Sequence, residues 1–389
     1  MHILVMSRTT LGHSLGGMQK QTMDLCEGFA AKGHQVSIIT TARKDGVAHE
    51  INDGIETHYL VGCKPEHYSR MWNNLAGKKI AEIHQAKPIN IIHSQSMGAN
   101  GVIKWANQNS VPIVSTWHGT SLSELSAFFP QASYHPRYWH WLAITPATFI
   151  KRHFLMELPV RKASQAITLV SPTLEKHMIR HAKGKVVTIP NGVHIPASIE
   201  DRDNQGIIQI ISIGRLVKQK GVQHAIHALA GLTRNLRDKT HLNIVGDGPY
   251  LGNLKALCQE LNLEDNVIFH GRLTGQPLVD IYQKCSVHLM PTTSHEGLPL
   301  TILEGMAYGL ATIASNIGGI PTAISDGQDG ILIRPGNVSD LTNELAELIK
   351  NEGHRENIGS AARKTVQQRY SMQKMVDDTL EVLSRYAKE

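Results

Sequence analysis

The sequence predicts an α/β protein built from two doubly wound domains, and three observations support this prediction. The chain has 389 residues, which is more than a single hydrophobic core usually supports. Short apolar runs alternate with amphipathic stretches along both halves of the chain. A polar segment separates the two halves, as a linker between domains would.

Buried strands are predicted wherever a short apolar run is flanked by turn residues. In the N-terminal half these runs cover residues 2–6, 35–40, 89–93, 112–116, 166–170 and 185–189. Longer amphipathic stretches, such as residues 18–31, lie between them and predict helices. Continuous apolar strands separated by helices indicate a parallel sheet covered on both faces.

The polar segment at residues 195–205 is expected to bury nothing. A second alternation follows, with strands expected at residues 207–213, 241–245, 266–270, 286–290, 311–314 and 330–333. We therefore expect an N-terminal domain over residues 1–195 and a C-terminal domain over residues 206–370. The pattern alone allows the last helix, near residues 371–387, to pack on either domain.

Composition indicates a soluble globular protein, with 41% hydrophobic and 19% charged residues. The first apolar run is too short for a signal peptide, and no uncharged apolar stretch reaches the roughly 18 residues of a spanning helix. The protein is therefore expected in the cytoplasm. The four cysteines form no CxxC pair, so we expect buried thiols rather than a zinc or redox motif.

The strongest local motif is HEGLPLTILE, which begins at His295 and follows a predicted strand. Pro299 suits the first turn of a helix, so Glu296 is expected in the preceding loop and Glu304 inside the helix. Two carboxylates at this spacing suit the hydroxyl groups at the two ends of a sugar nucleotide. The alternative is that Glu296 caps the helix and Glu304 is solvated.

A glycine-flanked basic loop, GRLVKQKG, follows the first strand of the second half and extends from Gly214 to Gly221. Arg215 and Lys220 supply the paired positive charge that a diphosphate requires, and glycines allow close approach of the backbone. A solvated basic turn is the alternative interpretation.

Two weaker features lie in the first half. Gly16 and Gly17 open a helix after the first strand, where paired glycines let the backbone approach a phosphate, although a flexible loop would look the same. His118 follows another predicted strand. Since the chain contains 22 histidines, a core role for His118 is the alternative.

Taken in order, these motifs resemble those of the retaining glycosyltransferases of family 4. The matching segments are GGMQ from Gly16, HG from His118, VS from Val170, PNGV from Pro190, GRLVKQKG from Gly214, VGDGP from Val245, HGRL from His270, the Glu296 to Glu304 motif, and SNIGGIP from Ser315. The resemblance covers nearly the whole chain. It implies the GT-B fold, in which two Rossmann-like doubly wound domains face a central cleft.

The resemblance also implies roles for individual residues. Glu296 would bind the transferred sugar, with the Gly297 and Leu298 amides near the sugar or phosphate. Glu304 would hold the ribose, and Arg215 and Lys220 would stabilise the diphosphate leaving group. Gly17, beside Gly16, would approach the phosphates from the other domain, and His118 would lie by the reaction centre. Arg272 and Leu273 would meet the base, and Gly214 and Gly246 complete the expected donor-binding set.

The same resemblance places the C-terminal helix, residues 371–389, on the N-terminal domain. It implies transfer with retention from a nucleotide diphosphate sugar, with UDP favoured and GDP next, to a glycan, lipid-linked or small-molecule acceptor in polysaccharide biosynthesis. No metal, no other cofactor and no nucleic acid partner are expected. One departure from the family is His194, where Asp often follows the PNGV motif.

Two rival functions follow from the same sequence. A sugar-nucleotide epimerase can use this fold, because fold alone does not determine function. An NAD-dependent oxidoreductase is a more distant rival, because Gly246, Gly248 and Gly252 imitate a dinucleotide fingerprint with the wrong spacing. Asp201 and Asp203 imitate a metal-binding DxD motif, but they lie in the polar linker.

Positive charge is concentrated in one part of the N-terminal half. Residues 61–162 contain eleven Lys or Arg against four Glu, a net charge of +7 in a chain of net charge +6. Eight of the twenty aromatic residues fall within residues 128–154, next to Lys151 and Arg152. Aromatic residues beside cations are typical of a surface at an anionic membrane, so peripheral association with the inner membrane face is expected. Packing of these rings into the core is the alternative.

Overall fold

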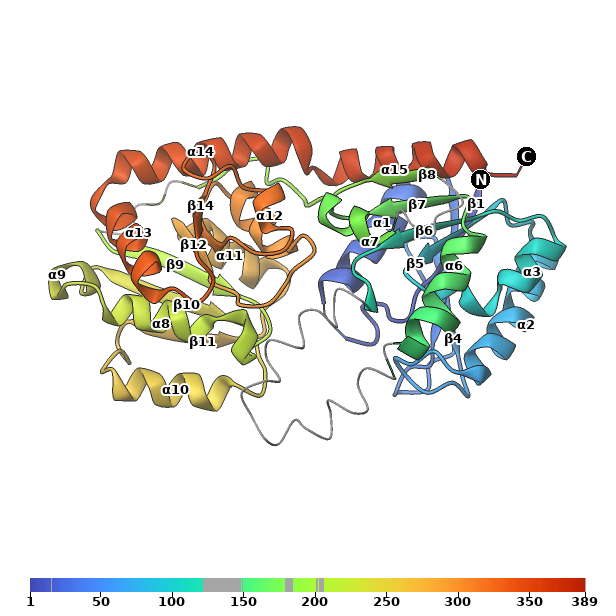
Figure 1. Cartoon of the computed structure of the whole chain (residues 1–389), viewed down its shortest axis with the longest axis horizontal. Helices are drawn as coiled ribbons and strands as arrows, with labels where there is room; N and C mark the ends of the chain where they lie inside the picture. The colour runs from blue at the N-terminus through green and yellow to red at the C-terminus, as the bar shows by residue number, and fades with distance from the viewer. Residues whose placement is uncertain are drawn as a thin grey trace. The chain divides into compact units, whose positions relative to one another are not determined.

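The computed structural model describes residues 1–14, 16–121, 148, 150–178, 185–200, 202 and 206–388. Contacts divide the chain into two compact units. Unit 1 comprises Met1–Asn191 together with Met372–Glu389, and unit 2 comprises Gly192–Ser371. Each unit contains a mainly parallel sheet with helices on it (Figure 1). The predicted α/β fold class is confirmed.

Within its described residues, unit 1 forms an eight-stranded sheet in the order β3-β4-β2-β1-β5-β6-β7-β8. The strands are β1 His2–Met6, β2 Gln35–Thr41, β3 His49–Asn52, β4 Ile55–Leu60, β5 Ile91–Gln95, β6 Ile113–Trp117, β7 Ala166–Leu169 and β8 Lys185–Thr188. The central strands β1, β5 and β6 are completely buried, which explains their continuous apolar sequences.

Helices pack on this sheet within the described part of unit 1. They are α1 Gly17–Ala31, α2 Arg70–Ala86, α3 Ile103–Gln108, α6 Leu158–Ala163, α7 Glu175–Met178 and α15 Met372–Tyr386. Ser69 caps α2, because its hydroxyl accepts a hydrogen bond from the Trp72 amide over 3.2 Å. Trp72 is fully buried and anchors α2 in the core beneath it.

The hairpin β3–β4 was not predicted from the sequence. β3 pairs antiparallel with β4, and Asp53 and Gly54 between them have φ values of 50° and 77°. Two consecutive positive φ values are typical of a type I′ turn, for which Asp-Gly is a preferred sequence. The Asp-Gly pair was therefore the available signal for a hairpin. It was overlooked because β3 is short and polar and does not look like a strand.

Helix α15 packs on α1, far from it in sequence. Gly28 of α1 leaves the space that Val376 fills, because a Cβ at Gly28 would lie 2.3 Å from a Val376 methyl group. Lys32 and Asp377 form an ion pair of 2.6 Å across the same contact. The buried face of α15, including Met375 and Leu383, joins the core of unit 1.

Within its described residues, unit 2 forms a six-stranded parallel sheet in the order β11-β10-β9-β12-β13-β14. The strands are β9 Ile208–Ile213, β10 Thr240–Val245, β11 Val267–Gly271, β12 Val287–Met290, β13 Ala311–Ser315 and β14 Ile331–Ile333. The helices are α8 Val222–Ala230, α9 Arg234–Arg237, α10 Leu251–Glu260, α11 Gln276–Lys284, α12 Leu300–Ala307, α13 Val338–Lys350 and α14 Glu352–Arg369.

The polar segment before β9 corrects one expectation, because parts of it are half-buried against unit 2. Arg202 donates to the carbonyl oxygens of Gln283, Tyr308 and Gly309. The Pro196 carbonyl accepts from Arg363 over 2.6 Å. A guanidinium carries five donors in a fixed fork, so one arginine can bind several carbonyls at a helix end. The prediction that this segment buries nothing was therefore wrong.

Cys26, Cys63, Cys258 and Cys285 are all buried free thiols, as expected. Among the residues that the structure describes, no helix has both the length and the apolar character needed to span a bilayer.

Candidate functional site

The sheet of unit 2 reverses its direction of growth between β9 and β12. β9 pairs with β10 on one side and with β12 on the other, and both pairings are parallel. Ligands of open parallel sheets bind at such a switch point, beyond the carboxyl ends of the strands. The basic loop after β9 and the Glu296 loop after β12 are therefore next to each other at the expected edge.

Backbone contacts fasten these two loops together. The Gln219 carbonyl accepts hydrogen bonds from the Thr293 amide over 2.8 Å and from the Thr292 hydroxyl over 3.0 Å. Gly221 has a φ of 77°, and a Cβ there would lie 1.8 Å from the Pro291 carbonyl oxygen. Only glycine allows this approach. The position of Lys220 is thus fixed by the loop that carries Glu296.

Lys220 and Glu296 form an ion pair at this point. Lys220 Nζ donates to Glu296 Oε1 over 2.7 Å, and the two side chains are 26% and 18% exposed. The same carboxylate oxygen accepts from the Ser294 hydroxyl over 3.2 Å. Glu296 precedes α12 rather than lying within it, as predicted. The lysine and the glutamate that the sequence placed 76 residues apart are in contact.

Arg215, in contrast, extends into solvent from the turn that follows β9. Its side chain is exposed, and its guanidinium forms no hydrogen bond or ion pair with the residues described. Gly214 before it has a φ of 152°, which favours glycine, and its amide donates to Val245. A charged side chain on a rigid turn can bind an anion without first breaking an ion pair.

Glu304 lies on α12 and is half-buried, so the interpretation of it as a solvated residue is wrong. Its Oε2 accepts a hydrogen bond from the Tyr282 hydroxyl over 3.1 Å. Tyr282 is buried and stacks on Tyr308, with ring centroids 4.9 Å apart. Burial, followed by the Glu304 charge, raises the pKa of Tyr282 well above its usual value. Tyr282 therefore remains a neutral donor that orients the carboxylate.

The loop after β11 meets the same tyrosines. Leu273 packs against the small core that contains Tyr282, with Tyr308 packed on it as well, whereas Arg272 is exposed. Leu298 is 5% exposed and belongs to the core beneath α12. Its side chain is therefore structural rather than a ligand contact.

The structure gives Gly246 and Gly248 a packing role. A Cβ on Gly246 would lie 1.9 Å from the Gly214 carbonyl oxygen, and one on Gly248 would lie 2.3 Å from that of Leu216. The turns after β9 and β10 are thus in direct backbone contact. These glycines are explained without a dinucleotide, which removes the main support for the NAD-dependent rival.

In unit 1, Gly16 and Gly17 follow β1, which is itself a switch point because β2 and β5 lie on its two sides. Gly16 is the extended residue before α1, and both glycines are exposed. The first amides of a 15-residue helix are available at this edge. A helix N-terminus with exposed amides favours an anion.

His118 follows β6 and is held by a residue of the neighbouring strand. Its Nε2 lies 2.9 Å from Gln95 Oε1, at the end of β5. Burial lowers the pKa of His118 to about 4, so the imidazole is neutral in neutral solution. Because Nε2–H donates to the Gln95 oxygen, Nδ1 carries no proton and is an acceptor. His118 is therefore an oriented neutral acceptor, and its expected place by the reaction centre stays a prediction.

The basic segment is less exposed than its charge suggested. Arg161 is 1% exposed, and its guanidinium lies 5.0 Å from the centre of the Trp117 ring. Arg152 donates to the Ser121 hydroxyl over 2.6 Å, and both arginines pair with the buried Glu157. Two of the cations counted on the surface are therefore structural. Most of the aromatic residues expected on the membrane surface lie outside the described residues, namely those from Phe128 to Trp141 and Phe149. Asp201 and Asp203 also lie outside them.

Two family models match the chain. Residues 15–195 match the model described as glycosyltransferase family 4, and residues 198–365 match that described as glycosyl transferases group 1. The chain belongs to the family 4 glycosyltransferases. Together, the two matches cover both units except for the N-terminal strand and the end of the chain.

Similar proteins support this assignment. N-acetyl-alpha-D-glucosaminyl L-malate synthase of Bacillus anthracis is 25% identical over 382 residues, covering 93% of this chain and 92% of that protein. The structure of sucrose-phosphate synthase from Thermosynechococcus elongatus has a TM-score of 0.81 at 19% identity and covers 99% of this chain and 98% of its own. A UDP complex of Anabaena HepE has a TM-score of 0.74 at 18% identity, with coverages of 99% and 100%. The fold is therefore GT-B.

Sequence reasoning missed the residues that hold the candidate groups. Gln95, Tyr282 and Ser294 orient His118, Glu304 and Glu296, respectively. Gln95 and Ser294 each come shortly after a predicted strand. That position could have marked them as residues near the site. Tyr282 lies in the last turn of α11, and nothing local to it indicates Glu304 as a partner.

Proposed function

We propose that the protein transfers a sugar from a nucleotide diphosphate sugar to a hydroxyl acceptor with retention of the anomeric configuration. The observation that carries the proposal is the Lys220–Glu296 pair at the switch point of unit 2. The pair puts a cation for a diphosphate and a carboxylate for sugar hydroxyls within one hydrogen bond of each other. That is the juxtaposition that the two halves of such a donor require.

In the proposed reaction, negative charge grows on the leaving diphosphate as its bond to the sugar breaks. Lys220 and Arg215 lower the barrier if they bind this charge more strongly in the transition state than in the ground state. Lys220 exchanges its Glu296 contact for the phosphate, and Glu296 is then free to accept from the sugar. Both side chains are partly exposed, so this exchange costs little.

The opposite end of the donor is assigned to Glu304 and the residues around it. A carboxylate can accept from two adjacent ribose hydroxyls, and Tyr282 holds it in place by occupying Oε2. Leu273, which packs on the same tyrosine core, brings the loop after β11 to this end. We assign the base to the backbone of Arg272 and Leu273, with UDP as the favoured nucleotide and GDP next.

In unit 1, we assign the helix N-terminus at Gly16 and Gly17 to the diphosphate and His118 to a sugar hydroxyl. A neutral imidazole whose Nδ1 is an acceptor suits a hydroxyl donor. Among the residues that the structure describes, no carboxylate is clearly placed as a nucleophile. We therefore propose displacement on one face of the sugar, in which the leaving phosphate receives the proton of the acceptor hydroxyl. The cations supply the charge that a metal would, so the reaction is proposed to need none.

The acceptor is proposed to be lipid-linked, or a glycan at the membrane surface, used in polysaccharide assembly. Ile150, Phe154 and Leu155 are 55%, 58% and 59% exposed, and Lys151 beside them is also exposed. Exposed apolar side chains with an adjacent cation are suited to the interface of an anionic membrane. We accordingly propose peripheral membrane association through these four residues, which we call the 150–155 patch.

A thermal-shift panel tests the donor assignment. UDP, GDP, their sugars and NAD are compared at equal concentration, and a nucleotide diphosphate is expected to raise the melting temperature, because a ligand that binds only the folded state stabilises it. A shift with NAD alone would contradict the proposal. Incubating the best donor without an acceptor then separates transfer from epimerisation, because an epimerase converts its substrate alone.

A further inference from the structure

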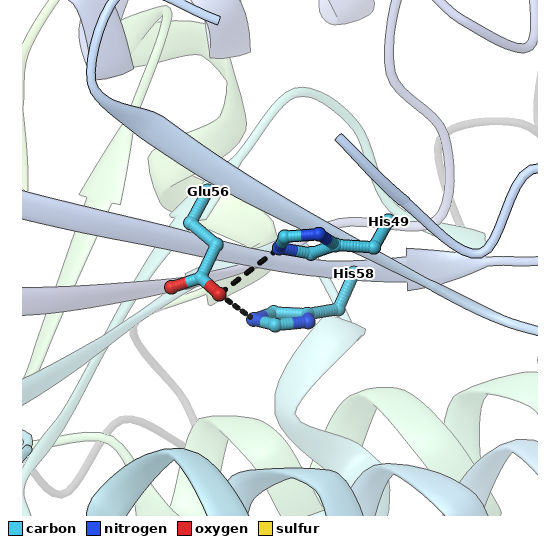
Figure 2. Close-up of side chains that lie close together, drawn as sticks. All are labelled: His49, Glu56 and His58. Atoms are coloured by element: carbon cyan, nitrogen blue, oxygen red, sulfur yellow. Dashed lines mark hydrogen bonds and ion pairs between the residues drawn. The ribbon is translucent and has the colours of Figure 1, made fainter. Parts of the chain in front are cut away.

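One face of the hairpin β3–β4 brings together three side chains that the proposed reaction does not use. His49 on β3 is directly opposite His58 on β4, and Glu56 precedes His58 by two residues. Alternate residues of a strand share a face, so the two imidazoles and the carboxylate lie on the same side. Figure 2 shows the three side chains pointing toward one another.

The donor atoms converge on one oxygen. The Nε2 atoms of His49 and His58 lie 3.0 and 3.3 Å from Glu56 Oε1. One potential ligand atom from each residue falls within 4.8 Å of the others. Two imidazole nitrogens and a carboxylate oxygen are a ligand set that zinc uses, with metal–ligand distances of about 2.0–2.2 Å. Small rotations of the three side chains would satisfy these distances.

A second observation indicates that the present arrangement is incomplete. The Nε2 atom of His58 is buried and makes no hydrogen bond of acceptable geometry, although it lies close to Glu56. A buried polar atom without a well-aligned hydrogen bond is costly and calls for an explanation. A metal ion among the three groups would give this nitrogen a ligand bond.

There is also room for a further ligand. The three residues line an open pocket of about 510 Å³, whose other wall includes Lys78, Lys79 and Glu82. Glu82 pairs with Lys79 and is 62% exposed. Three protein ligands and an open side leave the fourth position of a tetrahedral ion to water or to this carboxylate.

We propose that His49, Glu56 and His58 form a binding site for one divalent transition-metal ion, with zinc as the best fit. Histidine suits zinc, copper and nickel, whereas magnesium and calcium prefer oxygen ligands. Each histidine binds through Nε2, so its proton moves to Nδ1 or is released.

The bound ion links β3 to the rest of the sheet. β3 is an edge strand whose only partner in the described sheet is β4, and two metal ligands from β4 and one from β3 fix their register. On the other face of the hairpin, Tyr59 and Arg43 both donate to Glu50, so the ion would also steady this contact. The expected role is structural, and it does not depend on the proposed transfer reaction.

The test is a zinc titration of full-length protein without a histidine tag, made metal-free with a chelator. Calorimetry is expected to show one tight equivalent, and zinc should raise the melting temperature. Cobalt bound at the same site should give the visible absorption of a tetrahedral complex and be displaced by zinc. His49→Gln, Glu56→Gln and His58→Gln are each expected to weaken binding by more than the 10- to 100-fold that loss of an outer partner causes.

His227→Gln is the matched control, because His227 is an exposed histidine of unit 2. It should leave the tight equivalent unchanged. Melting curves of the metal-free variants show whether each variant folds. Glu56→Gln disturbs the fold least, because glutamine has nearly the same shape as glutamate. The proposal would be overturned if the folded Glu56→Gln and His58→Gln variants each bound zinc as tightly as the parent protein. Loss of the tight equivalent in His227→Gln would also overturn it. Tight binding of magnesium in preference to zinc would do the same.

Discussion

Lys220 donates a hydrogen bond of 2.7 Å to Glu296 across the switch point of the second sheet. The two residues come from loops after β9 and β12, and the Gln219 carbonyl, which accepts from Thr292 and Thr293, holds these loops together. The pair holds the lysine ammonium in place before any substrate arrives. Such preorganisation is what makes a fixed cation effective in catalysis.

The first prediction concerns the two cations. Arg215→Ala and Lys220→Ala should each lower kcat by about 100- to 1,000-fold, the usual loss for one preorganised electrostatic donor. Melting temperatures should change little, because Arg215 is exposed and Glu296 keeps the Ser294 hydroxyl as a donor. Lys218→Ala, an exposed lysine of the same loop, is the matched control. Near-normal kcat in both test variants would remove these cations from the reaction.

The second prediction separates the two glutamates. Glu304→Ala should weaken binding of the free nucleotide diphosphate by about tenfold or more, the scale of a hydrogen bond to a charged group. Tyr282→Phe removes the hydroxyl that orients Glu304 and should cause a smaller loss in the same direction. Glu296→Ala should mainly weaken the sugar-bearing donor. Isothermal titration of both ligands against all three variants measures this, and equal losses for both ligands in every variant would refute the division.

The third prediction concerns metals. Transfer should persist after treatment with a chelator, because Arg215 and Lys220 supply the positive charge at the diphosphate. Loss of the proposed hairpin ion would lower the melting temperature without abolishing transfer. Complete loss of activity that is restored by a divalent metal would contradict the metal-independent mechanism, and measuring the His58→Gln variant in parallel shows which site is responsible.

The fourth prediction is a pH dependence of stability. Burial lowers the pKa of His288 to about 4 from its ordinary value of 6.5, and neither ring nitrogen has a hydrogen-bond partner among the described residues. Because the unfolded chain binds the proton and the folded chain does not, stability is lost as pH falls from 6.5 to about 4, by up to about 1.4 kcal/mol per pH unit. The loss ends below the folded pKa.

His288→Gln removes this titrating group, so the melting temperature of the variant should depend less on pH over the same interval. His93 and His118 have similarly lowered pKa values of about 4, so some dependence will remain. An unchanged pH profile in a folded variant would show that His288 does not titrate as described. Above pH 6.5 the two proteins should differ by a constant amount.

Much of this fold was predictable because buried parallel strands have continuous apolar sequences. The runs at residues 2–6 and 207–213 match β1 and β9 to within one residue. The hairpin was missed because β3 has exposed polar residues and no apolar run. The register that opposes His49 to His58 depends on that hairpin, so the proposed metal site could not be read from spacing.

The candidate residues were found by their place after strands, but their partners were not. Pairing of Lys220 with Glu296 follows from the order β9-β12 in the sheet, which no local pattern specifies. The full burial of Arg161 and the partial burial of Arg152 and Arg202 were also missed, because arginine is usually exposed. Arg152 and Arg202 bind a hydroxyl and a carbonyl of residues distant in sequence. Arg161 pairs with Glu157 one helical turn away.

The last prediction concerns the membrane. The 150–155 patch should bind anionic vesicles, with affinity that rises with the fraction of anionic lipid and falls with salt, because exposed charges are screened. Each basic residue near such a surface contributes about 1 kcal/mol, and the exposed apolar side chains add to this by burial. Sedimentation with vesicles should therefore fall in Lys151→Glu and in Phe154→Ser, and most in the double variant.

The choice of control variants follows from the contacts of the basic residues. Arg152 is unsuitable for this test, because it contacts Ser121 and Glu157 and its replacement would disturb folding. Lys104→Glu makes the same charge change at an exposed residue of α3 and should bind vesicles as the parent does. Equal loss of vesicle binding in Lys104→Glu and Lys151→Glu would show that only the net charge of the protein matters and not the 150–155 patch. No binding to anionic vesicles at low salt would refute membrane association and leave the transferase assignment in place.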